Sequence, residues 1–107
     1  MFASIRRYSL DAGEMNDLLH LIDTDFAESI SEVDGFVAYE VLDCDGTEVV
    51  TLSVFRDEDA ARESDTMAME WVRSTLLPQF DVTLMDTMHG DIAVSRAREA
   101  MLEPAHR

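Results

Sequence analysis

The stretch FVAYEVLDCDGTEVVTLSVF, residues Phe36–Phe55, decides the fold of this chain. Two apolar runs of strand-like composition flank the pair Asp45-Gly46, and an Asp-Gly pair between such runs is a strong hairpin signal. A two-residue turn at this pair would place Leu42 opposite Val49 and Phe36 opposite Phe55. The sequence therefore predicts a β-hairpin at the centre of the fold.

The predicted register divides the side chains of the hairpin between two faces. One face is apolar apart from a phenol, and we expect helices to cover it: Val37, Tyr39, Val41, Val50, Leu52 and Val54. The second face is mixed, and we expect a partner subunit to cover it: Phe36, Ala38, Glu40, Leu42, Val49, Thr51, Ser53 and Phe55. A buried carboxylate needs compensation, so Glu40 should lie near Arg6, Arg96 or water.

The residues before the hairpin predict a strand and an amphipathic helix. Phe2–Ser9 alternates in polarity, as a strand does. Asp11 followed by Glu14 has the spacing of a capping box and predicts a helix start. Gly35 is expected to end this helix. Between these signals, apolar residues recur within one helical arc: Met15, Leu18, Leu19, Ile22, Phe26 and Ile30.

The residues after the hairpin predict a second helix and a last strand. The acidic run from Asp57 suits a helix N-terminus, and Pro78 should close the helix. We predict that the last strand spans Asp91–Ala97, after a connection with one short extended segment. The inner arc of the helix holds small, apolar and hydroxyl side chains: Ala60, Ser64, Met67, Ala68, Trp71 and Thr75.

This order of elements predicts an α+β, ferredoxin-like βαββαβ fold, in which two helices cover one face of a four-stranded antiparallel sheet. We expect one domain over 1–107, with a core at 2–97 and a flexible tail at 98–107. Because the hairpin needs cover on both faces, the sequence also predicts a homodimer whose sheets pack together.

The charge of the chain restricts its partners. There are 23 acidic and 8 basic residues, a net charge of −15, and every basic residue is arginine. Such a surface repels nucleic acids and anionic membranes, so neither is an expected partner. The composition resembles that of salt-adapted, halophilic proteins, and an acidic protein from a high-GC mesophile is the alternative. The N-terminal residues show no signal peptide, which predicts a cytoplasmic protein.

The central block resembles the antibiotic biosynthesis monooxygenase-like family of dimeric α/β-barrel proteins. The similar features are the strand FVAYEV, the Asp-Gly hairpin, a strand that ends in SVFRD, and a helix with Ser64 and Glu70-Trp71-Val72. The resemblance covers roughly residues 2–97. It implies a homodimer with a small pocket between helices and sheet in each subunit, and an activity such as oxidation of an aromatic compound without a bound cofactor.

Five residues are candidates for this pocket. Trp71 is either a core anchor or an aromatic wall for a flat ligand, and Met67 lies one turn before it. A buried Tyr39 needs a hydrogen-bond partner, for which Ser64 is the nearest candidate. His89 lies in the expected connection, where it either reaches the pocket mouth or is plain surface. All five are positioning candidates, and no catalytic residue is assigned.

Two other functions receive less support from the sequence. Haem-degrading relatives use a strand Asn, a helix Trp and a helix His, and only the tryptophan has a match here, at Trp71. The histidines are scattered and Cys44 is the single cysteine, so no metal site or cofactor is expected. The sequence predicts a protein that binds a hydrophobic or aromatic small molecule and that either oxidises it or serves as a non-catalytic dimeric binding domain.

Overall fold

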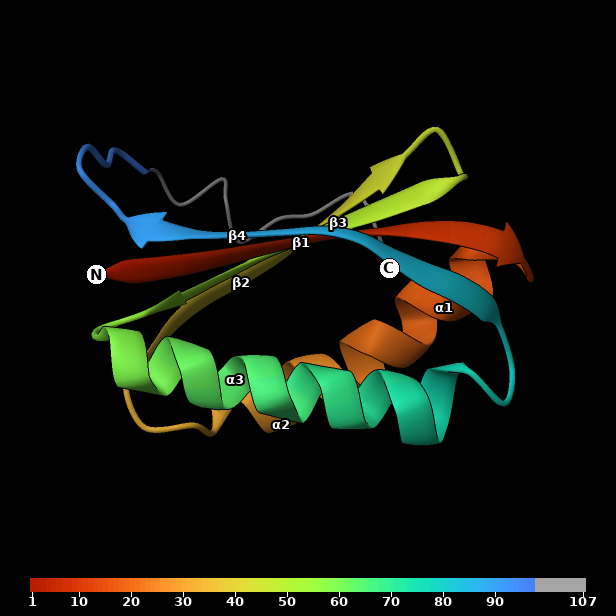
Figure 1. Ribbon diagram of the computed structural model, residues 1–107, viewed down its shortest axis with the longest axis horizontal. Helices are drawn as coiled ribbons and strands as arrows, with labels where there is room; N and C mark the ends of the chain where they lie inside the picture. Colours follow the sequence, from red (N-terminus) through yellow and green to blue (C-terminus); the bar gives the residue numbers. More distant parts are fainter. Residues whose placement is uncertain (98–107) are drawn as a thin grey trace.

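The computed structural model describes residues 1–97, so the expected tail lies outside the described residues. Figure 1 shows one antiparallel sheet with all helices on one side of it. The strands are β1 (Phe2–Ala12), β2 (Phe36–Cys44), β3 (Glu48–Phe55) and β4 (Asp81–Asp91), in the order β2-β3-β1-β4. The predicted ferredoxin-like α+β arrangement is confirmed.

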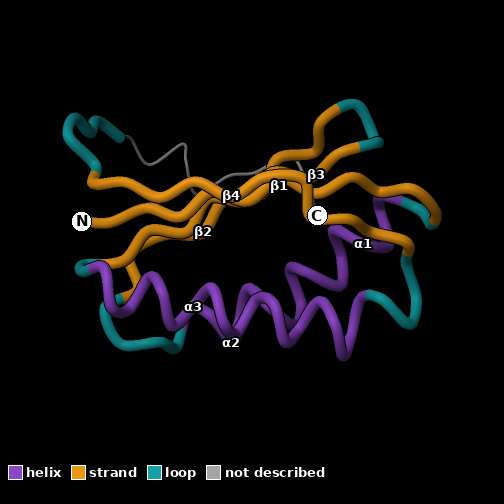
Figure 2. Tube along the Cα trace, viewed as in Figure 1, coloured by secondary structure: helices purple, strands orange, loops and turns teal. Residues whose placement is uncertain are grey.

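Two helical segments form the second layer, and each contains a π-helical turn (Figure 2). The first runs through α1 (Met15–Leu21), η1 (Ile22–Phe26) and α2 (Ala27–Ser31), and the second through α3 (Glu58–Trp71) and η2 (Val72–Leu76). No helix among residues 1–97 is long and apolar enough to cross a membrane.

The hairpin forms at the predicted turn, but its register differs by one residue. Asp45 and Gly46 both have positive φ, and the Thr47 N–H donates to the Cys44 carbonyl at 3.2 Å. Thr47 is then left unpaired, because Cys44 pairs with Glu48 and Leu42 with Val50. An irregularity after Phe36 takes up the extra residue, so the predicted Phe36–Phe55 pair forms.

This shift corrects the predicted faces, because a slip of one residue turns every side chain of a strand over. Tyr39 and Val41 face the helices as predicted, but their neighbours on β3 are Ser53 and Thr51. The predicted helix-facing residues Val50, Leu52 and Val54 lie on the opposite face. The residues of β3 that face the helices are Val49, Thr51, Ser53 and Phe55, and all four are buried.

The first helix has the predicted apolar arc, but the predicted capping box is wrong. Met15, Leu18, Ile22, Phe26 and Ile30 are all buried. Asp11 instead belongs to β1, where its carboxylate accepts hydrogen bonds from Ser9 and Thr83. Pairing with β4 extends β1 to Ala12, so the helix begins only after the turn that follows.

The last strand lies about ten residues before its predicted position. The strand β4 pairs with the whole length of β1, from Ala12↔Asp81 to Phe2↔Asp91. Beyond Asp91 the neighbouring strand has ended, so residues 92–97 have no strand to pair with, although their polarity alternates. As an edge strand, β4 is mostly exposed, and its own hydrophobic pattern is therefore weak.

The core lies between the sheet and the helices, in two clusters bridged by Tyr39 and Trp71. The opposite face of the sheet has no helix of the described chain on it (Figure 1). That face presents apolar side chains, and Leu42 and Met88 on it are about half exposed. Its Glu40 does not meet Arg6, because Arg6 lies on the helix side of the sheet, paired with Asp65.

Candidate functional site

A small cavity lies between the sheet and the helices and has an almost wholly apolar wall. Its volume is about 30 Å³, which is room for one or two water molecules. The wall includes aliphatic side chains from both helical segments and three polar side chains from the strands β1 and β3, namely Arg6, Tyr8 and Thr51. Of the residues that line it, only Arg6 carries a charge.

Both π-helical turns border this cavity. Ile22 and Phe26 come from η1, and Val72 and Leu76 come from η2. A π-helical turn inserts a residue into a helix, and such turns occur frequently at functional sites. The two helical segments therefore widen at the same place, over the same region of the sheet.

Trp71 forms part of the cavity wall and links the two helical segments. Its indole Nε1 donates to Asp25 Oδ2 at 3.0 Å, across to η1. Its ring lies 5.2 Å from that of Phe26, centroid to centroid. Since Trp71 is partly rather than fully buried and contacts the cavity, it acts both as a packing residue and as a wall of the site.

Two phenols contribute hydrogen-bonding capacity to the cavity. Tyr39 packs edge-on against Phe26, at 5.7 Å between ring centroids. Burial raises the pKa of Tyr39 far above its usual value, with Tyr8 adding to the rise and Arg6 opposing it. Burial likewise raises the pKa of Tyr8, against the effect of Arg6. Both phenols therefore stay protonated at neutral pH and can donate a hydrogen bond.

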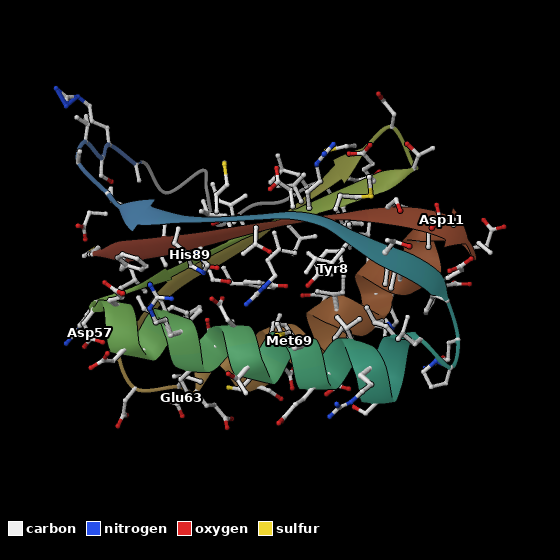
Figure 3. The ribbon with its side chains drawn as sticks, viewed as in Figure 1. Tyr8, Asp11, Asp57, Glu63, Met69 and His89 are labelled. Atoms are coloured by element: carbon white, nitrogen blue, oxygen red, sulfur yellow. The ribbon has the colours of Figure 1, made fainter. Side chains whose placement is uncertain are left out.

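A cluster of polar side chains around Asp65 adjoins the cavity. Asp65 Oδ1 accepts hydrogen bonds from Arg6 and, at 2.8 Å, from Ser4. Asp65 Oδ2 lies 2.6 Å from His89 Nε2. Arg6 is 3% exposed, so Asp65 on α3 compensates a buried charge on β1. Figure 3 shows Tyr8 and His89 on the side of the sheet that faces the helices.

The structure brings together only some of the residues proposed from the sequence. Trp71 and Tyr39 line the cavity, whereas Met67 packs against the neighbouring core cluster. Ser64 is fully buried, but its hydroxyl donates to the Ala61 carbonyl at 2.6 Å rather than to Tyr39. His89 is not in a connection: it belongs to β4, stacks on Phe2 and contacts Asp65.

Sequence reasoning missed Arg6, Tyr8, Thr51 and Asp65. A signal for Asp65 exists, because it lies four residues after Ala61 and three before Ala68, both of which are buried. The alternation Phe2, Ser4, Arg6 likewise places the arginine on the face of Phe2. No local pattern shows that the two charged residues meet, since they are separated by 59 positions.

The comparisons with known proteins identify the family. The sequence model described as antibiotic biosynthesis monooxygenase matches residues 1–68, more than half of the chain. The chain belongs to the antibiotic biosynthesis monooxygenase family. None of the curated proteins compared matches it.

Solved structures of similar fold include other proteins with names from this monooxygenase family. SnoaB from Streptomyces nogalater, described as a cofactor-independent oxygenase, is 17% identical, with a TM-score of 0.61 over 92% of this chain and 96% of that one. A monooxygenase from the gene ActVA-Orf6 of Streptomyces coelicolor, solved with nanaomycin D, is 22% identical (TM-score 0.59, 90% and 92%). A dimeric ferredoxin-like protein from an uncultured marine organism is 12% identical (TM-score 0.65, 91% and 98%). At these identities the likeness extends to the fold.

The side chains around the cavity do not fit haem, the alternative ligand that the family suggests. The wall contains no histidine, cysteine or methionine, which are common axial ligands of haem iron, and tyrosine is the one usual ligand type present. His89 lies outside the wall, with its Nε2 against Asp65. Within residues 1–97, no group of three or more His, Cys, Asp or Glu side chains is placed to hold a metal ion.

Proposed function

We propose that the cavity binds a small hydrophobic or aromatic molecule between helices and sheet, with Trp71 and Tyr39 as positioning residues. The observation that supports this most is the composition of the wall, which combines apolar side chains with a few polar groups beside a partly buried tryptophan. Binding requires the walls to move apart, because about 30 Å³ does not hold an aromatic ring. The two π-helical turns are the places where the helices can yield.

We propose further that a bound substrate is oxidised by dioxygen without a bound cofactor, as family membership suggests. A suitable substrate has an activated CH₂ between two aromatic rings: the substrate, R₂CH₂, reacts with O₂ to give R₂C=O and H₂O. The carbon supplies all four electrons, so no other reductant is needed. The part of the chain would be to exclude water and to orient the substrate. A non-catalytic binding domain is the alternative, and an oxygen electrode with anthrone as probe separates the two.

Calorimetric titration with a neutral aromatic amide, 2-naphthamide, tests the binding proposal. We expect one site per chain in the wild type. Ala68 lines the cavity, so Ala68→Val should fill it and abolish binding. Met69 is 65% exposed on the same helix, and Met69→Val should bind as the wild type does. Equal binding by both variants would place the ligand elsewhere and overturn the proposal.

We also propose that the chain is a homodimer, formed through the sheet face opposite the helices. The apolar side chains of that face and the dimeric neighbour of the same fold support this proposal. Leu52→Asp places a charge in that face and should give a monomer by sedimentation velocity. Met69→Asp, on the outside of α3, is the matched control and should leave the dimer intact. A wild-type monomer would contradict the proposal.

A further inference from the structure

The guanidinium of Arg6 has hydrogen-bonding capacity that the protein does not use. An arginine side chain has five N–H donors. Within residues 1–97, the side chain of Arg6 makes hydrogen bonds to one residue, Asp65. Arg6 is 3% exposed, yet it lines the cavity, so its remaining donors are close to the site rather than to bulk water.

The sign of this charge contrasts with the rest of the protein. The chain has 23 acidic residues and a net charge of −15, whereas no carboxylate lines the cavity. The wall also contains no imidazole, and its two phenols are held in the protonated form by burial. The wall therefore offers hydrogen-bond donors and one positive charge, and it offers no base that could take a proton from a ligand.

We propose that Arg6 is an anion-binding residue and that the ligand of this cavity is an aromatic molecule with one ionised oxygen, a phenolate or a carboxylate. This inference rests on the proposed function. A guanidinium binds such an oxygen through charge-assisted hydrogen bonds, which are stronger in an apolar site than in water. Because the wall has no base, the ligand enters already ionised, and the protonated phenols stand beside it as further donors.

Asp65 acts as a positioning residue in this arrangement. It holds Arg6 from the α3 side, and its own second oxygen is occupied by His89. When Arg6 is replaced, Asp65 keeps its contacts with Ser4 and His89. Substitution of Arg6 therefore leaves the acidic partner hydrogen-bonded, which makes Arg6 variants suitable for a binding test.

The test compares two ligands of equal size, 2-naphthoate and 2-naphthamide, by calorimetry at pH 8 in 0.5 M NaCl, where the long-range charge of the protein is screened. We expect the wild type to prefer naphthoate by roughly tenfold or more, as a charge-assisted contact implies. Arg6→Met should lose this preference and still bind naphthamide. Arg6→Lys should retain part of it.

Arg7→Met is the matched control. Arg7 is the next residue on β1, lies on the opposite face of the sheet and pairs with Glu48, so its replacement should leave the preference unchanged. Equal binding of the two ligands by the wild type, or an unchanged preference in Arg6→Met, would overturn the inference and leave the proposed function standing. Failure of both ligands to bind would overturn both. If Arg6→Met does not fold, the wild-type comparison decides.

Discussion

At the residue scale, the contact between Arg6 and Asp65 joins the sheet to the helix layer. Arg6 is buried and the Asp65 side chain is 19% exposed, so the pair lies at the inner edge of the interface. Removal of one partner of a buried ion pair is costly, because the remaining charge is left without compensation. The pair is also the one part of the site that charge patterning along the chain does not reveal.

Asp65→Ala should therefore destabilise the protein strongly. We expect the free energy of unfolding to fall by about 3–5 kcal/mol, since Arg6 would remain buried and charged. Urea denaturation measures this loss. Glu63 lies on the outer side of the same helix (Figure 3), and Glu63→Ala should change stability by no more than about 0.5 kcal/mol. A similar small change in Asp65→Ala would show that water compensates Arg6.

The two tyrosines predict a loss of stability at alkaline pH. Their folded-state pKa values are raised, so above about pH 10 the unfolded chain releases protons that the native state retains. The free energy of unfolding should then fall with rising pH, by about 1.4 kcal/mol per pH unit for each tyrosine that stays protonated. Denaturation between pH 9 and 11 measures the slope. Tyr39→Phe should reduce it, and an unchanged slope would contradict the burial of that phenol.

At the element scale, the sequence predicted each helix and the central hairpin because their signals are local. The apolar arc from Met15 to Ile30 and the Asp45-Gly46 turn are properties of neighbouring residues. The one-residue offset at Thr47 is not, because strand pairing and the hydrogen bond from Leu10 N–H to the Thr47 carbonyl help to fix it. The strand β4 was missed for the same reason: β1 defines it, rather than its own alternation.

The turn from β1 into α1 depends on Gly13. Its φ is +114°, and a Cβ placed there would lie 2.6 Å from Phe80 Cδ1. Gly13→Ala should therefore destabilise the protein by about 1–3 kcal/mol, through backbone strain and displacement of Phe80. Thermal denaturation measures the effect. Gly90→Ala meets no atom within 4 Å and serves as control; an equal effect of the two substitutions would contradict the turn geometry.

At the scale of the whole molecule, the net charge of −15 decides how the protein responds to salt. Repulsion among exposed carboxylates opposes the compact state, and the screening length falls from about 10 Å at 0.1 M salt to about 3 Å at 1 M. The halophilic origin suggested by composition stays a prediction, as do the cytoplasmic location and the single-domain organisation over 1–107.

Sodium chloride should accordingly raise the melting temperature steadily between 0.05 and 1 M. The physical reason is the screening of carboxylate repulsion, which an uncharged osmolyte cannot provide. Sucrose at equal osmolality is therefore the control, and it should have the smaller effect. A melting temperature that falls with salt would show that attractive ion pairs, such as Arg6–Asp65, dominate the electrostatics instead.

The most direct test of the central claim, that an aromatic molecule binds in the cavity beside Trp71, is an NMR titration. Trp71 is the sole tryptophan, so its indole N–H gives a single side-chain resonance of its kind. Addition of 2-naphthamide should shift that resonance progressively and to saturation, together with signals of Val49 and Leu76 in the cavity wall. If these resonances stay in place while surface signals move, or if nothing moves, the cavity is core packing and the account of its function is wrong.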